Sequence, residues 1–295
     1  MVKLIPLLLL FGVHAGMAQD LPAKLQVSVT SGYEQQDLRW SIAGNTNGQN
    51  PNILSELKWK NVAGPVTGLH IQYRFFNHWQ LEGEYAHPFF LSGKVYDTDY
   101  GSNDRTNKVY DEQFNAGKGG ADRWQAGLAN RIPLTRTISI TPSAGYGIFH
   151  QTLYIAGNTS IFSNLNSTYK TKWAGPYGQI LCSLAPTKKL GMNAGIRYSQ
   201  VRYRASANWN LIREFNHPES FRHTANGYGI HAHTSMLYRA SRMHSIGITG
   251  TYSCWQTGRG IDEMYLAGGG SQQTQLNEVH SAGWQVKVEW RISFY

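Results

Sequence analysis

WQVKVEWRISFY, residues 284–295, ends the chain with apolar and polar side chains in unbroken alternation. Because successive side chains of a β-strand point to opposite faces, this stretch has one apolar face and one polar face. Strands of bacterial outer-membrane barrels show this alternation, since one face meets lipid and the other meets the lumen. The stretch therefore predicts a membrane-spanning strand in an all-β, antiparallel transmembrane β-barrel of the bacterial outer membrane.

The first 18 residues have the composition of a secretory signal peptide. Lys3 supplies a positive start, residues 4–13 an apolar core, and Gly16, Met17 and Ala18 a small-residue cleavage site. The apolar core is too short to cross a bilayer as a helix, which takes about 20 residues. We expect a signal peptide at 1–18 and a single barrel domain at 19–295.

The overall composition supports a barrel rather than a bundle of membrane helices. Mean hydropathy is −0.40, and no other stretch approaches an apolar run long enough for a spanning helix. The chain has 9 Trp, 17 Tyr, 11 Phe and 31 Gly, and outer-membrane barrels carry aromatic girdles at both edges of their apolar belt. A soluble secreted β-sandwich is the alternative fold.

The charge of the chain points to lipid rather than to nucleic acid. The formal net charge is +9, but Lys and Arg are spread along strands instead of forming one basic face with interleaved aromatics, so no nucleic-acid partner is expected. The anionic phosphates of lipopolysaccharide are the expected counterpart of these cations.

The two cysteines are not expected to form a disulfide. Cys182 shares a strand face with Ile180 and Leu184, and Cys254 shares one with Ile248 and Tyr252. Both should therefore point to lipid from strands that are not adjacent, and we interpret both as small buried hydrophobic side chains.

Alternating runs bounded by turn residues predict about ten strands. They fall near 24–43, 53–76, 79–97, 111–134, 138–157, 167–186, 190–209, 227–240, 243–258 and 281–295. Short connections at 77–78, 135–137, 187–189 and 241–242 alternate with long polar ones at 44–52, 98–110, 158–166, 210–226 and 259–280. Since periplasmic turns are short and extracellular loops long, both termini should be periplasmic and five loops should face outward.

Parity along the strands predicts which polar side chains face the lumen. A break in the alternation between Tyr198 and Val201 suggests a β-bulge. A barrel of this size is filled mostly by side chains, which disfavours a general porin. The predicted lumen-facing residues are Glu56, Lys58, Lys60, Arg74, Arg197, Arg202, Arg204, His231 and His233.

The strongest candidate for chemistry is the pair Asp97 and Asp99 at the outer end of the third strand. Side chains at i and i+2 of a strand lie on the same face. Two carboxylates so close raise one pKa, and the pair can then hold a proton or position a water. The alternatives are an acidic loop start without function and a site that binds a stray cation.

This part of the sequence resembles the omptins, ten-stranded outer-membrane proteases, whose first acid pair lies at the same place. Residues 54–60, LSELKWK, look like the second strand of the omptins, and residues 196–199, IRYS, look like the seventh. The resemblance covers essentially the whole mature chain. It implies a surface endopeptidase that needs lipopolysaccharide and no other cofactor.

The sequence departs from the second half of the omptin site, an Asp-x-His dyad at the outer end of the seventh strand in which His activates water. His217 is the nearby histidine, but Phe215 stands two residues before it, and a gapless count places Asn208 and Asn210 over the dyad. The resemblance therefore implies catalysis by Asp97, Asp99 and His217, or else a catalytically inactive barrel that binds a partner or lipid or joins a larger outer-membrane assembly.

Other constellations are weaker. His231 and His233 lie on one strand face but lack a third ligand, so no metal is expected. Ser220 and His223 are close in sequence, as in the barrel-wall Ser-His arrangement of lipid-A acyl hydrolases, but Ser and His are frequent enough here for coincidence. The extracellular loops are the expected place for a peptide substrate or a protein partner.

Overall fold

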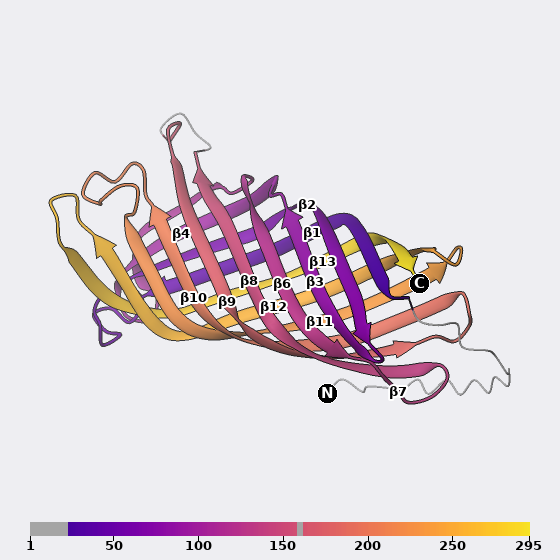
Figure 1. Ribbon diagram of the computed structural model, residues 1–295. Helices are drawn as coiled ribbons and strands as arrows, with labels where there is room; N and C mark the ends of the chain where they lie inside the picture. The colour runs from indigo at the N-terminus through magenta and orange to yellow at the C-terminus, as the bar shows by residue number, and fades with distance from the viewer. Residues whose placement is uncertain (1–22, 158–161) are drawn as a thin grey trace, which may run out of the picture.

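The computed structural model describes residues 23–157 and 162–295, so the predicted signal peptide at 1–18 lies outside the described residues. These residues form one antiparallel sheet that closes on itself (Figure 1). Its strands are β1 (Leu25–Ile42), β2 (Ser55–Phe76), β3 (Trp79–Pro88), β4 (Ser92–Ser102), β5 (Thr106–Asn115), β6 (Gly119–Asn130), β7 (Ile132–Pro133), β8 (Ile138–Ala156), β9 (Asn166–Leu184), β10 (Leu190–Asn208), β11 (Phe221–Arg239), β12 (His244–Tyr265) and β13 (Ser271–Phe294).

The sheet is a barrel because β1 pairs with β2 on one side and with β13 on the other. Two strands of the barrel are interrupted. β3 continues as β4 after residues 89–91, and β5 continues as β6 after residues 116–118. Counting each of these as one, and β7 as an extension of β6, the ring has ten strands, as predicted. No helix able to span a membrane was found among the described residues.

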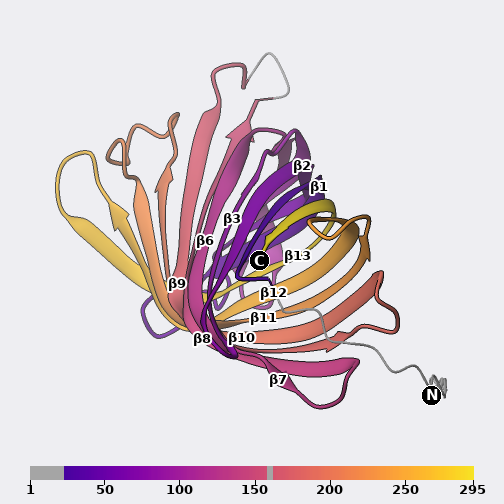
Figure 2. The same ribbon diagram turned by 45° about the vertical axis from the view of Figure 1, so that its right-hand side comes forward.

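The connections separate by length onto the two ends of the barrel. Short turns join β2 to β3, β9 to β10 and β11 to β12 at the end where the C-terminus lies, and Figure 2 shows this end coming forward. The other end carries the longer loops, including residues 43–54 and 209–220. Several loops are shorter than predicted, because β4, β5, β11, β12 and β13 extend beyond the lipid belt as ordinary strands.

An apolar belt surrounds the half of the barrel nearer the short turns. Outward residues in this half are broadly exposed, among them Ile180, Ile196, Ile246 and Val288. The C-terminal strand contributes Trp284, Val286, Val288, Trp290 and Phe294 to this surface, which confirms its lipid face. Toward the loops the belt ends on outward aromatic rings that contact each other in pairs: Tyr33 with Trp284, Tyr85 with Trp124, and Tyr198 with Tyr228. Such aromatics mark a membrane interface.

The interior of the barrel differs between its two halves. Within the lipid belt it holds a cavity of about 640 Å³ lined by polar and charged side chains, Arg74, Arg197, His231 and His233 among them, as predicted. Toward the loops the interior is filled by an aromatic core. We define this aromatic core as Trp40, Trp59, Phe149, Tyr169, Trp173, Tyr203, Phe221 and Trp255, whose rings pack in series.

The predicted lumen position of Glu56, Lys58 and Lys60 is wrong. Leu57 and Trp59 point inward and are almost fully buried, while Lys60 lies on the outside. The physical reason is a β-bulge: the register of β2 against β4 shifts between Lys60 and Ala63, and Asn61 has φ of 53°. One extra residue exchanges the two faces of a strand.

The predicted bulge in β10 is also wrong, for a different reason. β10 keeps one register with β11 from Leu190 to Ala207, so Val201 and Tyr203 point inward and Arg202 and Arg204 outward. What changes along β10 is the environment. Above the belt the outer face meets water and the inner face meets the aromatic core, so polarity inverts while the backbone parity continues.

The two cysteines are free and do not form a disulfide, as predicted. Cys182 is exposed on the outer surface of β9 rather than buried, which corrects the interpretation as a buried side chain. Cys254 is partly buried on β12.

Candidate functional site at the mouth of the barrel

Asp97 and Asp99 lie on the inner face of β4, at the mouth of the barrel. Their cross-strand partners are Leu57 and Ser55 on β2 and Glu112 and Tyr110 on β5. Burial, together with the charge of Asp99, raises the pKa of Asp97 to about 7. Burial also raises the pKa of Asp99, against a hydrogen bond from Ser55 that lowers it. Asp97 can thus take up or release a proton near neutral pH.

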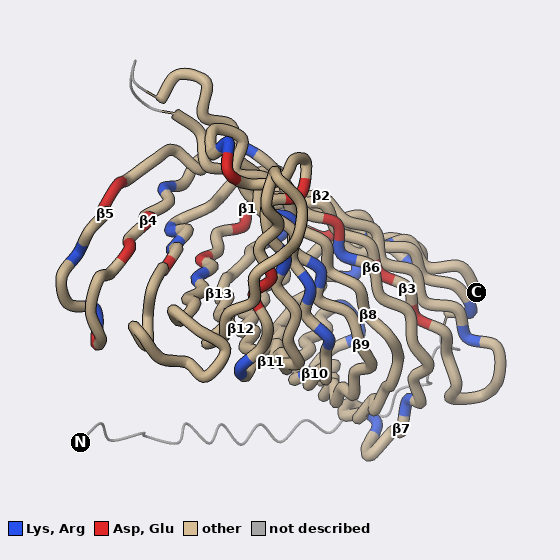
Figure 3. Tube along the Cα trace, turned by 90° about the vertical axis from the view of Figure 1, so that its left-hand side faces the viewer, with Lys and Arg blue, Asp and Glu red and all other residues tan. Residues whose placement is uncertain are grey.

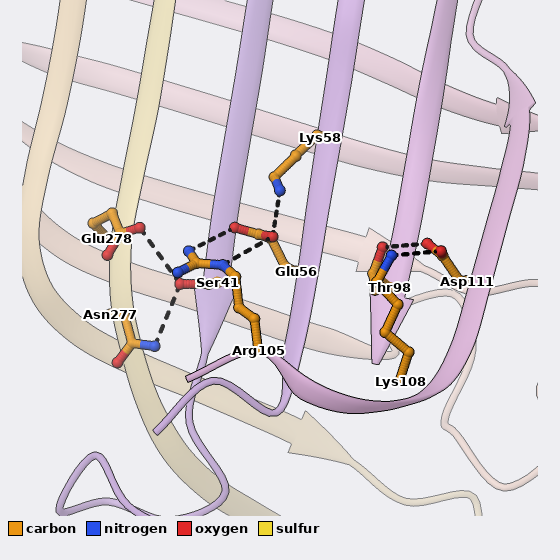
Figure 4. Close-up of polar contacts among 9 residues, drawn as sticks. All are labelled: Ser41, Glu56, Lys58, Thr98, Arg105, Lys108, Asp111, Asn277 and Glu278. Carbon is orange, nitrogen blue, oxygen red and sulfur yellow. Dashed lines mark hydrogen bonds and ion pairs between the residues drawn. The ribbon is translucent and has the colours of Figure 1, made fainter. Parts of the chain in front are cut away.

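The β4–β5 hairpin that carries the acid pair is fastened to β2 on the outer face, as Figure 4 shows. Arg105, in the turn of the hairpin, donates to Glu56 at 2.9 Å and 3.4 Å, and Lys58 forms a second ion pair with the same carboxylate. Glu56 is almost fully buried, which opposes ionisation, but the hydrogen bonds from Arg105 and Lys58 outweigh burial and lower the pKa of Glu56. The carboxylate is therefore charged at neutral pH.

Further hydrogen bonds join the turn of the hairpin to the 43–54 loop and join β4 to β5 within the hairpin. Asn52 donates from its backbone to Asn103 and receives a hydrogen bond from the backbone of Asp104, both at 2.8 Å. Thr98 donates to Asp111 at 2.9 Å across the hairpin. Figure 3 shows acidic and basic residues interspersed on β4 and β5. The hairpin pairs with β2 along β4, but on its other side β5 pairs with β8 only through Asn115 and Ala156, so most of the hairpin has a neighbouring strand on one side only.

His217 lies in the 209–220 loop and is exposed. Its Nδ1 contacts Oδ1 of Asn208 at 2.7 Å and its Nε2 contacts the carbonyl oxygen of Ile212 at 3.1 Å. Both ring nitrogens are thus engaged by the loop itself and by the end of β10. Within residues 23–157 and 162–295, His217 has no hydrogen bond or ion pair with Asp97 or Asp99, so the structure does not bring the three predicted residues into contact.

His223 has an acidic partner that was not predicted from the sequence. Its Nε2 lies 3.1 Å from Oδ1 of Asp262, its directly opposite partner on β12. Its Nδ1 contacts the hydroxyl of Tyr169 at 2.8 Å, and that hydroxyl contacts Tyr203 at 2.6 Å. Pairing β11 with β12 residue by residue from the turn at 241–243 places His223 one residue away from Asp262. The bulge near Ala225 adds the residue that brings the two directly opposite each other.

This chain of side chains is closed to solvent. His223 is fully buried and packs edge-on against Trp40. Ser220 is also fully buried, and its hydroxyl is bonded to the backbone of Trp209 and Asn216. No contact joins Ser220 to His223 in the part of the chain that the structure describes, so the two do not form a Ser-His pair. The arrangement stabilises the aromatic core and presents no nucleophile to a substrate.

A basic strip on the outer wall stands apart from these contacts. It consists of Lys170 and Lys172 on β9 and Arg202 and Arg204 on β10, all exposed. Lys172 lies directly opposite Arg204, and on its other side it lies opposite His150. None of the four cations has an ion pair or a side-chain hydrogen bond within the described residues, and like charges in cross-strand pairs repel.

No group of three or more His, Cys, Asp or Glu side chains suited to a metal ion is present in residues 23–157 and 162–295. The ten-stranded ring, its lipid belt and the long-loop mouth define an outer-membrane β-barrel protein with an omptin-like fold. The structure is similar to the outer membrane protease OmpT of Escherichia coli, with a TM-score of 0.72 over 94% of this chain and 99% of that one. The sequences are 11% identical, so this likeness shows the fold alone.

The chain belongs to the Pom family, described as Protochlamydia outer membrane protein, whose model matches residues 28–294. Among other solved structures, the translocator domain of the autotransporter NalP from Neisseria meningitidis has a TM-score of 0.41 at 11% identity, covering 95% of this chain and 90% of that one. The outer membrane protein OprG from Pseudomonas aeruginosa has a TM-score of 0.38 at 11% identity, with 93% and 98% covered. No curated protein matches the sequence.

Proposed function

We propose that this protein is a sealed outer-membrane barrel that binds anionic lipid of the outer leaflet, lipopolysaccharide above all, on its outer wall. The basic strip carries the proposal. Four exposed cations have no protein partner, and the two that lie directly opposite each other, Lys172 and Arg204, repel unless an anion lies between them. Phosphate groups fill this role, because they accept several charge-assisted hydrogen bonds at once.

The height of the strip above the lipid belt supports a lipid ligand. Tyr198 marks the edge of the belt on β10, and Arg202 follows it four residues later on the same outer face. A strand rises about 3.3 Å per residue, so Arg202 lies roughly 13 Å further along a tilted strand. This is the level of lipid headgroups, where each Lys or Arg near an anionic surface contributes about 1 kcal/mol to binding.

The test is binding of purified protein to lipopolysaccharide in detergent micelles, measured by calorimetry. Arg204→Gln is expected to weaken binding about fivefold, which corresponds to about 1 kcal/mol, and the combined change of all four strip residues to Gln should weaken it much further. Arg213→Gln, an exposed loop cation outside the strip, is the matched control and should leave binding unchanged. Wild-type affinity in the fourfold variant would contradict the proposal.

Endopeptidase activity is the second candidate, because Asp97 and Asp99 lie on one strand face at the mouth, where burial and the charge of Asp99 raise the pKa of Asp97 to about 7. In this function the acids would polarise the attacking water and His217 would position it, which requires the 209–220 loop to release His217 from Asn208 and Ile212. Cleavage of a peptide library in lipopolysaccharide-containing micelles, abolished by Asp97→Ala, would support it. Absence of cleavage by the wild-type protein would contradict it without touching the lipid-binding proposal.

A protein partner is the third candidate. The long loops and the hairpin of β4 and β5 would supply its surface, as a subunit contact in a larger outer-membrane assembly. Extraction in mild detergent followed by copurification tests it, and a protein that always purifies alone would count against it.

A further inference from the structure

Cys254 and His280 form a thiol–imidazole pair on the outer wall of the barrel. Sγ of Cys254 on β12 lies 3.5 Å from Nε2 of His280 on β13. The register explains the contact: His280 lies opposite Gln256, so it is the diagonal neighbour of Cys254 on the same face. This face is the outer one, since Ile230, directly opposite Cys254 on β11, is exposed in the lipid belt. Both side chains are partly accessible.

The pair lies at the edge of the lipid belt. Tyr252, two residues before Cys254 on the same face, lies directly opposite Trp284, and both rings are exposed as membrane-interface aromatics. Cys254 and His280 lie just beyond these rings, toward the loops. This is the depth at which headgroups of outer-leaflet lipids join their acyl chains.

Charged groups from three strands surround the pair. Arg39 on β1 lies directly opposite His280 and has no ion pair among the described residues. Lys60 on β2 is held by Asp37 at 3.0 Å, and Glu278 lies two residues before His280 on the same face. The pair thus has a positive charge directly beside His280, and the Sγ–Nε2 contact of 3.5 Å lies within reach of proton transfer from the thiol to the imidazole.

We propose that Cys254 is a nucleophile, paired with His280 as its base, for the carboxylic ester groups that outer-leaflet lipids present at this depth. His280 Nε2 accepts the proton of Sγ, and the sulfur forms a bond to the ester carbonyl carbon. The carbon–oxygen bond to the alcohol then breaks, and the leaving alkoxide takes the proton from His280. The products are Cys254 carrying a thioester and a free alcohol, so atoms and charge balance without any oxidant or metal.

Cys182 provides an internal control. It lies on the outer wall of β9, exposed in the lipid belt, and has no contact with a histidine in the described part of the chain. The two thiols are thus in the same protein and on the same outer surface, but only Cys254 has a base beside it.

The first measurement is the rate of alkylation of Cys254 by iodoacetamide at pH 7, in micelles and in a Cys182→Ser background. An ordinary thiol with a pKa near 8.5 is only about 3% thiolate at this pH. Pairing with His280 should raise the rate about tenfold over the same protein with His280→Gln. Equal rates would overturn the proposal. Arg39→Gln is a second variant that leaves the pair in place and should slow alkylation by a smaller factor.

The second measurement uses p-nitrophenyl octanoate as the ester probe. We expect a burst of one equivalent of p-nitrophenol and an octanoyl adduct on Cys254, found by mass spectrometry and released by hydroxylamine. Cys254→Ser should abolish both and Cys182→Ser should preserve both, with heat-dependent gel migration confirming that each variant is folded. An adduct on Cys182, or on neither cysteine, would overturn the proposal even if Cys254 alkylates rapidly.

Discussion

At the scale of single residues, the mouth is built around side chains whose ionisation the structure changes. Asp97 is held among Leu57, Glu112 and Asp99, and its pKa is raised to about 7. Glu56, on the opposite face of the same wall, is buried but has two cations beside it, and its pKa is lowered. Carboxylates on the two faces of one wall therefore differ in charge near neutral pH.

The pKa of Asp97 predicts a stability that depends on pH. The folded protein holds the proton on Asp97 up to about pH 7, whereas an unfolded aspartate releases it near 3.8. The folded state therefore binds more protons between these values, and its stability falls as pH rises from about 4 to 7. Asp97→Asn should remove the contribution of Asp97 to this dependence and be more stable than wild type at pH 8, by up to about 4 kcal/mol, since one pKa unit corresponds to about 1.4 kcal/mol. Urea unfolding at pH 4 and pH 8 measures it.

At the scale of elements, the β4–β5 hairpin depends on its polar attachment to β2. Arg105→Gln should loosen the outer end of the hairpin, which remains paired with β2 along β4, because it leaves the buried carboxylate of Glu56 with Lys58 alone, at a cost of about 1–3 kcal/mol. Limited proteolysis within the hairpin should accelerate accordingly.

Lys108→Gln is the matched control for this prediction. Lys108 lies in the same hairpin and pairs with Asp111 at 2.7 Å, but both groups are exposed. Such pairs contribute little, about 0–1 kcal/mol. If the two variants are cleaved at the same rate, the ion pair of Arg105 and Glu56 does not hold the hairpin.

At the scale of the whole molecule, the barrel is closed by its own side chains. The polar cavity lies within the lipid belt, and the aromatic core fills the interior between this cavity and the mouth. Trp59 and Trp173 have essentially no exposed surface, as expected for a packed interior without a water path.

A sealed interior predicts that the protein does not conduct ions. In planar lipid bilayers the purified barrel should give no steady conductance under conditions where a general porin inserts and conducts. Regular ohmic steps that scale with protein concentration would show that the aromatic core opens, and would contradict a closed barrel.

The membrane-facing half of the protein was predictable from the sequence, and the half above the membrane was predictable only in part. Alternation placed Trp284, Ile196 and Arg197 correctly, because within the lipid belt every strand has apolar side chains outside and polar side chains inside. It misplaced Lys58 and Arg202, since above the belt water replaces lipid outside and the aromatic core replaces polar side chains inside. In β2 a bulge and the change of surroundings coincide, so the alternation in the sequence continues unchanged. In β10 the surroundings change without a bulge, so the alternation inverts.

The sequence by itself determined the outer-membrane barrel, its ten strands, the separation of short turns from long loops and the single strand face shared by Asp97 and Asp99. These follow from periodicity and turn length, which are local. The tertiary structure decided which residues meet across strands: His223 with Asp262, Arg105 with Glu56, and Cys254 with His280. Such contacts depend on the register between strands and on each bulge within them, and a one-residue shift in either changes the partner of every side chain beyond it.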